Sequence, residues 1–406
     1  MPVRGKIGVP DPSGVAAATH AVLTALAVRN YRSAHDLVVP LAPLTVVTGP
    51  NGSGKSNLYA ALRLLAHAAR GDVVAALARE GGLPNAMWAG PATVSRAMER
   101  GEVPVQGTAR QGPARVGLGF ATEDLGYLVE LGLPVPSSSA FDLDPVIKDE
   151  RIWSGPFCRQ AATLVERRGP TLRRRAGRRW QAVTGEVAAH DSLFEHAGDA
   201  AAVPEAFRLR ETIRGWRFYA GFRTDPDAPA RRAMPATRTP ALHHDGRDLA
   251  AALRTIVEVG DRAGLAAAID DAFPGTRLAV EPDGPGRLAL GLRQPGLLRP
   301  LGVREWSDGT LRYVLLVAAL LTPRPPPLIV LNEPEASLHP ELIEPLARLV
   351  RAASARAQLW VVSHSSALVR RLEADESAAS HTLGKSLGRT VITGLDALDR
   401  PPWRWA

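Results

Sequence analysis

The sequence has very little cysteine, which restricts its chemistry. Cys158 is the single cysteine among 406 residues, so no disulfide can form within one chain. The opening residues, MPVRGKIGVPDPSG, also lack the unbroken apolar segment that a secretory signal requires. We therefore expect a cytoplasmic protein.

Long hydrophobic runs are absent too. The longest strongly apolar stretch, residues 313–321, has about half of the roughly 20 residues that a helix needs to cross a bilayer. We therefore expect no membrane partner. The 45% hydrophobic and 22% charged residues are ordinary for a globular protein with two or three lobes. The net charge of +8 modestly favours a polyanionic partner such as nucleic acid.

The chain divides into four parts by composition. Residues 1–21 mix Gly, Pro, Ala and polar residues without period, which predicts a mobile tail. Residues 22–149 contain apolar β-type runs and form a predicted N-terminal lobe. Residues 150–214 are rich in arginine and poor in large apolar residues, so we expect an inserted helical lobe. Residues 215–406 form a predicted C-terminal lobe.

The C-terminal part alternates predicted strands and helices. Two β-type runs flank PDGPG and predict a hairpin, and an apolar helix covers about 311–321. The strand LIVL, a helix from Pro340 and the strand LWVVS then give a series with parallel strands. The fold class is therefore α/β with a mixed sheet.

A phosphate-binding loop is the strongest motif. GPNGSGKS fits G-x-x-x-x-G-K-[ST] and lies between a predicted strand and the helix that starts at Lys55. Its backbone N–H groups and the helix N-terminus can surround phosphate, Lys55 can reach the β and γ oxygens, and Ser56 can bind Mg²⁺. The predicted ATP-binding residues are Gly49, Pro50, Asn51, Gly52, Ser53, Gly54, Lys55, Ser56 and Asn57.

A second motif follows the strand LIVL. Asn332 and Glu333 stand at its carboxyl end, where ligands bind in parallel α/β sheets. Glu333 is placed to orient and polarise an attacking water, and phosphoryl transfer depends largely on such positioning. We predict Glu333 as the catalytic base of ATP hydrolysis.

Two weaker motifs accompany these. SDGTLR precedes the apolar helix, so Ser307 and Gly309 could present hydroxyl and N–H groups to a γ-phosphate, or Ser307 could simply cap that helix. His364 ends the strand of VVSHS at the same predicted edge of the sheet. Its order after the other motifs favours a γ-phosphate-sensing role over a structural one.

The ordered strings GPNGSGKSN, SDGTLR, NEPEASLHP and VVSHS resemble the ABC-type ATPase heads of RecF-like and SMC-like proteins, in a group of AAA-family ATPases. AVRNYRS before the P-loop also resembles the start of such heads. The resemblance implies ATP and Mg²⁺ as cofactors and an ATP-dependent head-to-head homodimer. Its signature residues would reach the γ-phosphate held at Lys55 of the partner chain: Ser307, Asp308 and Gly309. The implied D-loop residues are Ala336, Ser337, Leu338 and His339, with His364 as the switch histidine.

The sequence departs from this pattern in several places. Asn332 stands where an aspartate normally holds a Mg²⁺-bound water, so metal affinity and turnover are expected to be low. No Q-loop glutamine is assigned, since Gln106 and Gln111 lie in a Gly- and Pro-rich stretch. No long heptad arm is present. Only 42 residues follow His364, too few for a Toprim nuclease, so any nuclease would be a separate chain.

Two arginine-rich segments are candidates for DNA contact. Arg173, Arg174 and Arg175 lie in the predicted insert, although a solvated helix face explains them almost as well. Residues 215–235 mix arginines with Trp216, Phe218 and Tyr219, which suits a nucleic-acid surface. Core-packed aromatics with solvated or paired arginines are the favoured alternative there.

We therefore predict an ATP-hydrolysing, RecF/SMC-like head acting on DNA, in repair, chromosome maintenance or phage defence. The main rival is a nucleotide-gated switch that hydrolyses ATP slowly and controls a protein effector, motivated by Asn332. A transporter subunit is disfavoured by the long insert.

Overall fold

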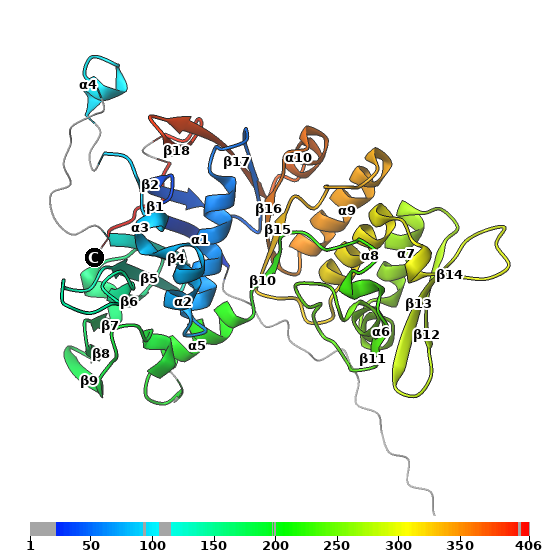
Figure 1. The fold of residues 1–406 in the computed structure, drawn as a ribbon, viewed down its shortest axis with the longest axis horizontal. Coiled ribbons are helices and arrows are strands. Elements are labelled where there is room, and N and C mark those ends of the chain that lie inside the picture. The colour runs from blue at the N-terminus through cyan, green and yellow to red at the C-terminus, as the bar shows by residue number, and fades with distance from the viewer. Residues whose placement is uncertain are drawn as a thin grey trace, which may run out of the picture.

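The computed structural model describes residues 22–91, 95–104, 115–196, 198, 200–396 and 399–405. The expected tail at 1–21, and both Gln106 and Gln111, lie outside the described residues. Figure 1 shows an N-terminal β-rich part on one side, helices and a small sheet on the other, and a second large sheet between them. No helix among the described residues has the length and apolar character of a membrane span.

The N-terminal part is built on an eight-stranded antiparallel sheet in the order β2-β1-β4-β5-β6-β7-β8-β9. Apolar residues of β1 and β4 pack against the helix after the P-loop, whose Leu58, Leu62 and Leu65 share a buried stripe. The strands are β1 (Leu23–Tyr31), β2 (Ala34–Pro40), β4 (Arg115–Thr122), β5 (Leu125–Gly132), β6 (Val146–Ser154), β7 (Thr163–Arg168), β8 (Thr171–Ala176) and β9 (Arg179–Glu186). The helices here are α1 (Lys55–Ala68), α2 (Val73–Arg79), α3 (Gly82–Ala86), α4 (Arg96–Glu99) and α5 (Pro204–Arg214).

The expectation that residues 150–214 form a helical insert is wrong. This segment supplies strands β7, β8, β9 and most of β6 to the N-terminal sheet, and α5 is its one α-helix among the described residues. Val165 and Leu172 are fully buried in the same hydrophobic core as α1. Arginine is abundant because these strands carry ion pairs on both faces, such as Arg168 with Glu166 and Arg174 with Glu205.

The central sheet has six strands in the order β10-β15-β16-β3-β17-β18. The first five are parallel to their neighbours, and β18 is antiparallel to β17. The strands are β3 (Leu44–Thr48), β10 (Arg217–Tyr219), β15 (Leu328–Asn332), β16 (Gln358–Val362), β17 (Ala378–Ser386) and β18 (Arg389–Ile392). The predicted mixed sheet is confirmed, and strands far apart in the sequence, such as β3 and β16, lie side by side.

The C-terminal part encloses a second core around α8, which is buried almost throughout its length. The predicted hairpin forms from β12 and β13. Bounds are α6 (Leu249–Val259), α7 (Arg262–Ala272), α8 (Asp308–Leu320), α9 (Ile343–Ser354), α10 (Ser366–Glu373), β11 (Met234–Pro235), β12 (Arg277–Pro282), β13 (Arg287–Arg293) and β14 (Leu301–Gly302). α6 ends before Gly260 as predicted, because glycine ends helices readily.

Candidate ATP-binding site

The carboxyl ends of three neighbouring parallel strands bring the sequence motifs together. In the register, Asn332 of β15 lies beside Val362 of β16, which lies beside Val47 of β3. The P-loop follows β3, Glu333 follows β15 and His364 follows β16 by two residues. Three motifs spread over more than 300 residues therefore share one edge, where ligands bind in parallel sheets.

The P-loop is shaped by glycines in conformations that other residues rarely adopt. Gly49 and Gly54 have φ of 139° and 113°. A Cβ on Gly49 would lie 2.4 Å from the Leu383 carbonyl oxygen, and one on Gly54 would lie 2.1 Å from Thr390 Oγ1. Neither position has space for a side chain, so the loop passes close against β17 and β18.

Lys55 is buried at the start of α1, and its ammonium group lies against the loop. Lys55 Nζ donates to the carbonyl oxygens of Gly49 at 2.6 Å and Pro50 at 2.9 Å. Burial lowers the pKa of Lys55, and the nearby Glu333 carboxylate offsets part of this shift. A phosphate would stabilise the charged ammonium further, so the position suits an anion.

Residues that the sequence analysis did not select support the P-loop from behind. Ser33 Oγ and Thr390 Oγ1 are 2.7 Å apart, and Thr390 Oγ1 also donates to the Ser53 carbonyl oxygen at 2.7 Å. Asn57 Nδ2 donates to Ser33 Oγ at 2.6 Å. Arg32, in the NYRS turn, pairs with Glu80 at 2.9 Å. The turn before β2 therefore helps to hold the P-loop in place.

Glu333 is held in a constrained backbone conformation. Its φ is +50°, in the left-handed region that non-glycine residues seldom occupy. Its N–H donates to the Val362 carbonyl at 2.8 Å, and its carbonyl accepts from Nη2 of the buried Arg312 at 2.8 Å. The carboxylate is 2.9 Å from His364 Nε2, and its side chain is 43% exposed. Glu333 therefore pairs with the predicted switch histidine and remains accessible to water.

A second glutamate, Glu335, fixes the loop that carries His364. Its Oε1 accepts hydrogen bonds from Ser363 Oγ at 2.6 Å and from the backbone N–H groups of His364 and Ser365 at 3.0 and 3.1 Å. The resemblance placed Glu335 at the start of the implied D-loop, within NEPEASLHP, and gave it no contact with the loop of His364. The signal available was its spacing of two from Glu333, which alone does not reveal the contact.

The signature residues lie on the C-terminal part of the chain. Ser307 Oγ accepts from Thr310 N at 3.2 Å and thus caps α8. Asp308 pairs at 3.1 Å with Arg231, which is buried and also donates to four backbone carbonyls. A Cβ on Gly309 would lie 3.0 Å from the Ser337 carbonyl oxygen, so signature and D-loop are adjacent. Ser307 and Asp308 themselves are exposed.

The predicted D-loop makes a tight turn after Glu333. The segment runs from Ala336 through Leu338 to His339, and Ser337 within it has a φ of +63°. His339 Nδ1 accepts a hydrogen bond from Glu341 N at 3.4 Å. This turn carries the chain from the end of β15 to α9. Its carbonyl at Ser337 sets the position of the signature glycine described above.

The predicted Mg²⁺ ligands are a hydroxyl and an amide. Ser56 is exposed in the first turn of α1, and Asn332 is the half-buried last residue of β15. Both offer oxygen, the donor that Mg²⁺ prefers, but neither carries charge. The donor set fits Mg²⁺ bound through water, with less electrostatic attraction than an aspartate would supply.

The arginines predicted to contact DNA have partners within the chain. Arg173 pairs with Glu166 and lies over the Trp180 ring at 5.0 Å, and Arg174 pairs with Glu205 at 3.3 Å. Arg175 donates to backbone carbonyls, including that of Ala161 at 2.5 Å. They stand on strand β8, not on a helix. Their contact with DNA stays a prediction.

The segment 215–235 has the core-packed aromatic residues and paired arginines that we favoured over a nucleic-acid surface. Trp216 and Tyr219 are buried in the two cores, and Phe218 is half-buried. Of its arginines, Arg231 is buried as described, and Arg223 forms a bidentate pair with Asp225 at 2.8 and 2.9 Å. The aromatic side chains therefore pack inside the protein.

SMC heads are among the solved structures that share this fold. The chain is similar to the SMC head bound to the C-winged helix domain of ScpA, with 13% identity over 93% of this chain and 99% of that one and a TM-score of 0.50. The SMC head domain from Thermotoga maritima is 15% identical over 93% of this chain and 100% of that one, with a TM-score of 0.48. The predicted P-loop fold of the ABC-type, SMC-like class is confirmed.

A short sequence match and a family match complete the comparisons. The chain is 43% identical over 44 residues to the OLD nuclease of Thermus scotoductus (strain ATCC 700910 / SA-01), a match that spans 11% of this chain and 8% of the nuclease. A family model matches residues 44–370, which include the P-loop, signature, Glu333 and His364. The chain therefore belongs to the family described as "AAA domain, putative AbiEii toxin, Type IV TA system".

Proposed function

We propose that this protein binds and hydrolyses ATP and that two copies of it close on one another around the nucleotide. The observation that carries the proposal is the Glu333–His364 pair, 2.9 Å apart at the sheet edge that also holds Lys55. A carboxylate beside a buried lysine and a P-loop is an arrangement suited to phosphoryl transfer to water. The match of residues 44–370 to an AAA-domain family agrees with ATP hydrolysis.

Each residue has a distinct part in the proposed reaction. The P-loop amides and Lys55 bind the β- and γ-phosphates and neutralise their charge. Glu333 accepts a proton from water as the water oxygen attacks the γ-phosphorus and the bond to the β-phosphate oxygen breaks. His364 fixes the Glu333 carboxylate. Mg²⁺, held by Ser56 and by Asn332 through water, would stabilise the developing charge on the phosphate oxygens.

The test is the rate of ATP hydrolysis in the wild type and in Glu333→Gln. Loss of the base should lower turnover about a hundredfold or more while ATP still binds. Glu376→Gln is a matched control, because Glu376 is exposed in the turn before β17, at the opposite edge of the sheet from the P-loop. Equal turnover in Glu333→Gln and in the control would refute the assignment of Glu333.

The finer role that we propose is action on DNA, with a separate nuclease or effector chain as partner. The net charge of +8 supports it, and so does the short likeness to the OLD nuclease of Thermus scotoductus. Linear duplex DNA should raise turnover if DNA is the substrate. Binding of duplex DNA that falls with salt but survives Arg173→Ala, Arg174→Ala and Arg175→Ala together would move the contact to another surface.

Asn332 favours a second candidate, a switch that binds ATP, hydrolyses it slowly and controls a protein effector. A neutral residue at this position weakens Mg²⁺ binding. Asn332→Asp should then raise turnover and lower the Mg²⁺ concentration needed for half-maximal rate. Unchanged turnover in this variant would count against the slow switch.

A further inference from the structure

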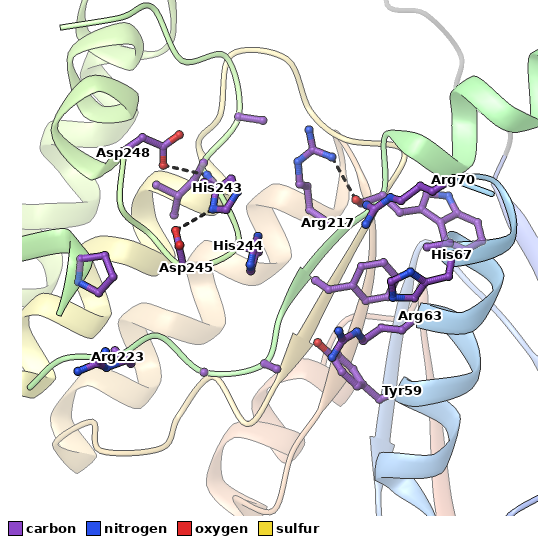
Figure 2. A pocket seen from close by; sticks show the side chains of 18 residues that line it. Tyr59, Arg63, His67, Arg70, Arg217, Arg223, His243, His244, Asp245 and Asp248 are labelled. Atoms are coloured by element: carbon purple, nitrogen blue, oxygen red, sulfur yellow. Dashed lines mark hydrogen bonds and ion pairs between the residues drawn. The ribbon is translucent and has the colours of Figure 1, made fainter. Parts of the chain in front are cut away.

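A cavity lies along α1, from its second turn to the residues just past its end. Its volume is about 630 Å³, and it is bounded by α1, by β10 with the segment after it, and by the loop 241–248. Figure 2 shows Tyr59, Arg63 and His67 on α1 and Arg70 just past its end, facing Arg217 of β10 and His244 across the opening. The volume falls in the range of sites for small molecules.

The lining of this cavity is strongly basic. Four arginines and three histidines face two aspartates: Arg63, Arg70, Arg217, Arg223, His67, His243, His244, Asp245 and Asp248. Both aspartates already have partners, since Asp248 accepts from His243 N at 2.9 Å and Asp245 accepts from His243 Nδ1 at 2.7 Å. The cavity therefore has an excess of positive charge that its own acids do not balance.

Three of these arginines have no carboxylate within ion-pair distance among the residues that the structure describes: Arg63, Arg70 and Arg217. The other ion pairs of the cavity are local, such as Arg223 with Asp225. Arg217 is kept in place by its Nη1, which donates to the carbonyls of Gly215 and Trp216 at 3.2 and 3.1 Å. Guanidinium groups bind phosphate through parallel hydrogen bonds, so these side chains suit a phosphate-bearing ligand.

A metal ion is the other occupant to consider, because His243, His244 and Asp245 bring their ligand atoms within 4.8 Å of one another. Arg247 Nη2, however, is 2.5 Å from His243 Nε2. Burial lowers the pKa of His244, and the positive neighbours His243, Arg247 and Arg63 lower it as well, against the opposing effect of Asp245. Burial disfavours a charge of either sign, but the effect of His243, Arg247 and Arg63 acts on positive charge and therefore disfavours a divalent cation as well.

We propose that this cavity binds a small molecule that carries two or more phosphate groups. Arg63 of α1 and Arg70 just past its end would contact it from one side and Arg217 from another, with the half-buried Phe218 and the ring of Tyr59 as an apolar wall. Since α1 begins at Lys55, such a ligand would join the P-loop helix to the loop 241–248 of the C-terminal part. It would favour whichever arrangement of these two parts it fits, and so bias ATP binding.

The experiment uses inorganic pyrophosphate as the probe and the full chain carrying Lys55→Ala, which weakens binding at the P-loop. Calorimetry of this chain should show one site for pyrophosphate, and adding Arg63→Gln with Arg70→Gln should weaken it about tenfold or more, the usual cost of lost charge-assisted hydrogen bonds. Both arginines are exposed and glutamine is a good helix former, so the fold should persist. Arg324→Gln, an exposed arginine away from the cavity, is the matched control.

Other outcomes overturn the proposal. Pyrophosphate binding that is equal in the cavity and control variants would show that the cavity holds no phosphate. Zn²⁺ binding that is lost in His243→Ala and His244→Ala would make it a metal site. Binding of a single-stranded oligonucleotide that needs Arg63 and Arg70 and is not displaced by pyrophosphate would make it a nucleic-acid contact. Because the Lys55→Ala chain is not expected to hydrolyse ATP, each result is independent of the proposed ATPase function.

Discussion

Glu335 is the residue on which the geometry of the switch loop depends. One carboxylate oxygen accepts three hydrogen bonds, and this holds Ser363, His364 and Ser365 against the end of β15. Such convergence on a charged acceptor positions the His364 ring beside Glu333. Glu335 is thus a positioning residue, two positions away from the proposed base.

We expect Glu335→Ala to lower both stability and turnover. Hydrogen bonds to a charged group are worth about 1.5–3 kcal/mol each, and two of the donors left behind belong to the buried Ser363 and the half-buried Ser365. Turnover should fall because His364 is released, while ATP binding by the P-loop should change little. Chemical denaturation and hydrolysis assays measure the two effects, with Glu376→Ala, at an exposed turn residue, as the control. Wild-type turnover in Glu335→Ala would mean that the loop keeps its shape without this anchor.

His381 makes stability depend on pH. It is buried on β17 beside Val47 of β3, and its Nε2 lies 2.7 Å from the Pro40 carbonyl, to which it donates as neutral imidazole. Burial lowers its pKa, and the hydrogen bond to Pro40 offsets only part of this shift. The unfolded chain therefore binds a proton more readily than the folded chain, and stability is lost as pH falls through the ordinary histidine pKa of about 6.5.

The measurement is the free energy of unfolding at pH 7.5 and pH 5.5. The wild type should lose stability over this interval, and His381→Gln should lose less, because glutamine keeps a donor for Pro40 but does not titrate. His190→Gln is the control, since the His190 side chain is 68% exposed. The same loss in His381→Gln and wild type would assign the pH dependence to other groups.

At the scale of elements, the periodicity of apolar residues predicted the helices and strands whose two faces differ clearly in hydrophobicity. α1 and the hairpin of β12 and β13 were predicted because one face of each is apolar. The strands β7 and β8 were missed because few of their residues are buried and apolar, among them Val165 and Leu172. Most of their remaining positions are charged, and a run of arginines has the same composition on a strand as on a helix.

The candidate site was predicted where a motif carries its own chemistry and missed where a contact spans the sequence. Lys55 and Glu333 follow from local patterns. Thr390, however, contacts Ser33 from 357 positions away, and nothing near either residue indicates the other. Arg231 is a similar case, since its partner Asp308 is 77 positions away. Only the arrangement of β18 and of the signature loop in three dimensions reveals these roles.

The C-terminal residues depend on two glycines of β4. Trp403 and Trp405 lie over this strand, and a Cβ on Gly119 would be 2.5 Å from Trp403 Cζ2 and 2.7 Å from the Tyr127 carbonyl oxygen. Gly119→Ala should therefore destabilise the protein by about 1–3 kcal/mol, because the indole must move. Thermal unfolding tests this, with Gly198→Ala as the control since no atom lies within 4 Å of its Cβ position. An unchanged unfolding temperature would mean that the tryptophans are dispensable.

At the scale of the whole molecule, the P-loop and the signature belong to different parts of the chain. Lys55 packs in the N-terminal part, whereas Ser307 is exposed at the start of α8, and its neighbour Asp308 is fixed by Arg231 to the C-terminal part. An exposed, rigidly held signature is suited to contact a second copy. We therefore predict that ATP is bound between Lys55 of one copy and Ser307 of the other.

Mixing two inactive variants distinguishes this arrangement from a site within one chain. Lys55→Ala and Ser307→Ala should each lower turnover to near background alone, the first by removing the lysine contact with the phosphates and the second by removing the signature hydroxyl from the γ-phosphate. In a mixed dimer, the intact Lys55 of the Ser307→Ala chain faces the intact Ser307 of the Lys55→Ala chain, so one complete site forms and hydrolysis should return. If both residues act within one chain, no molecule in the mixture has a complete site and turnover stays at background. A mixture containing Glu333→Gln in the Ser307→Ala chain is the control, because its single complete site then lacks the base and should remain inactive.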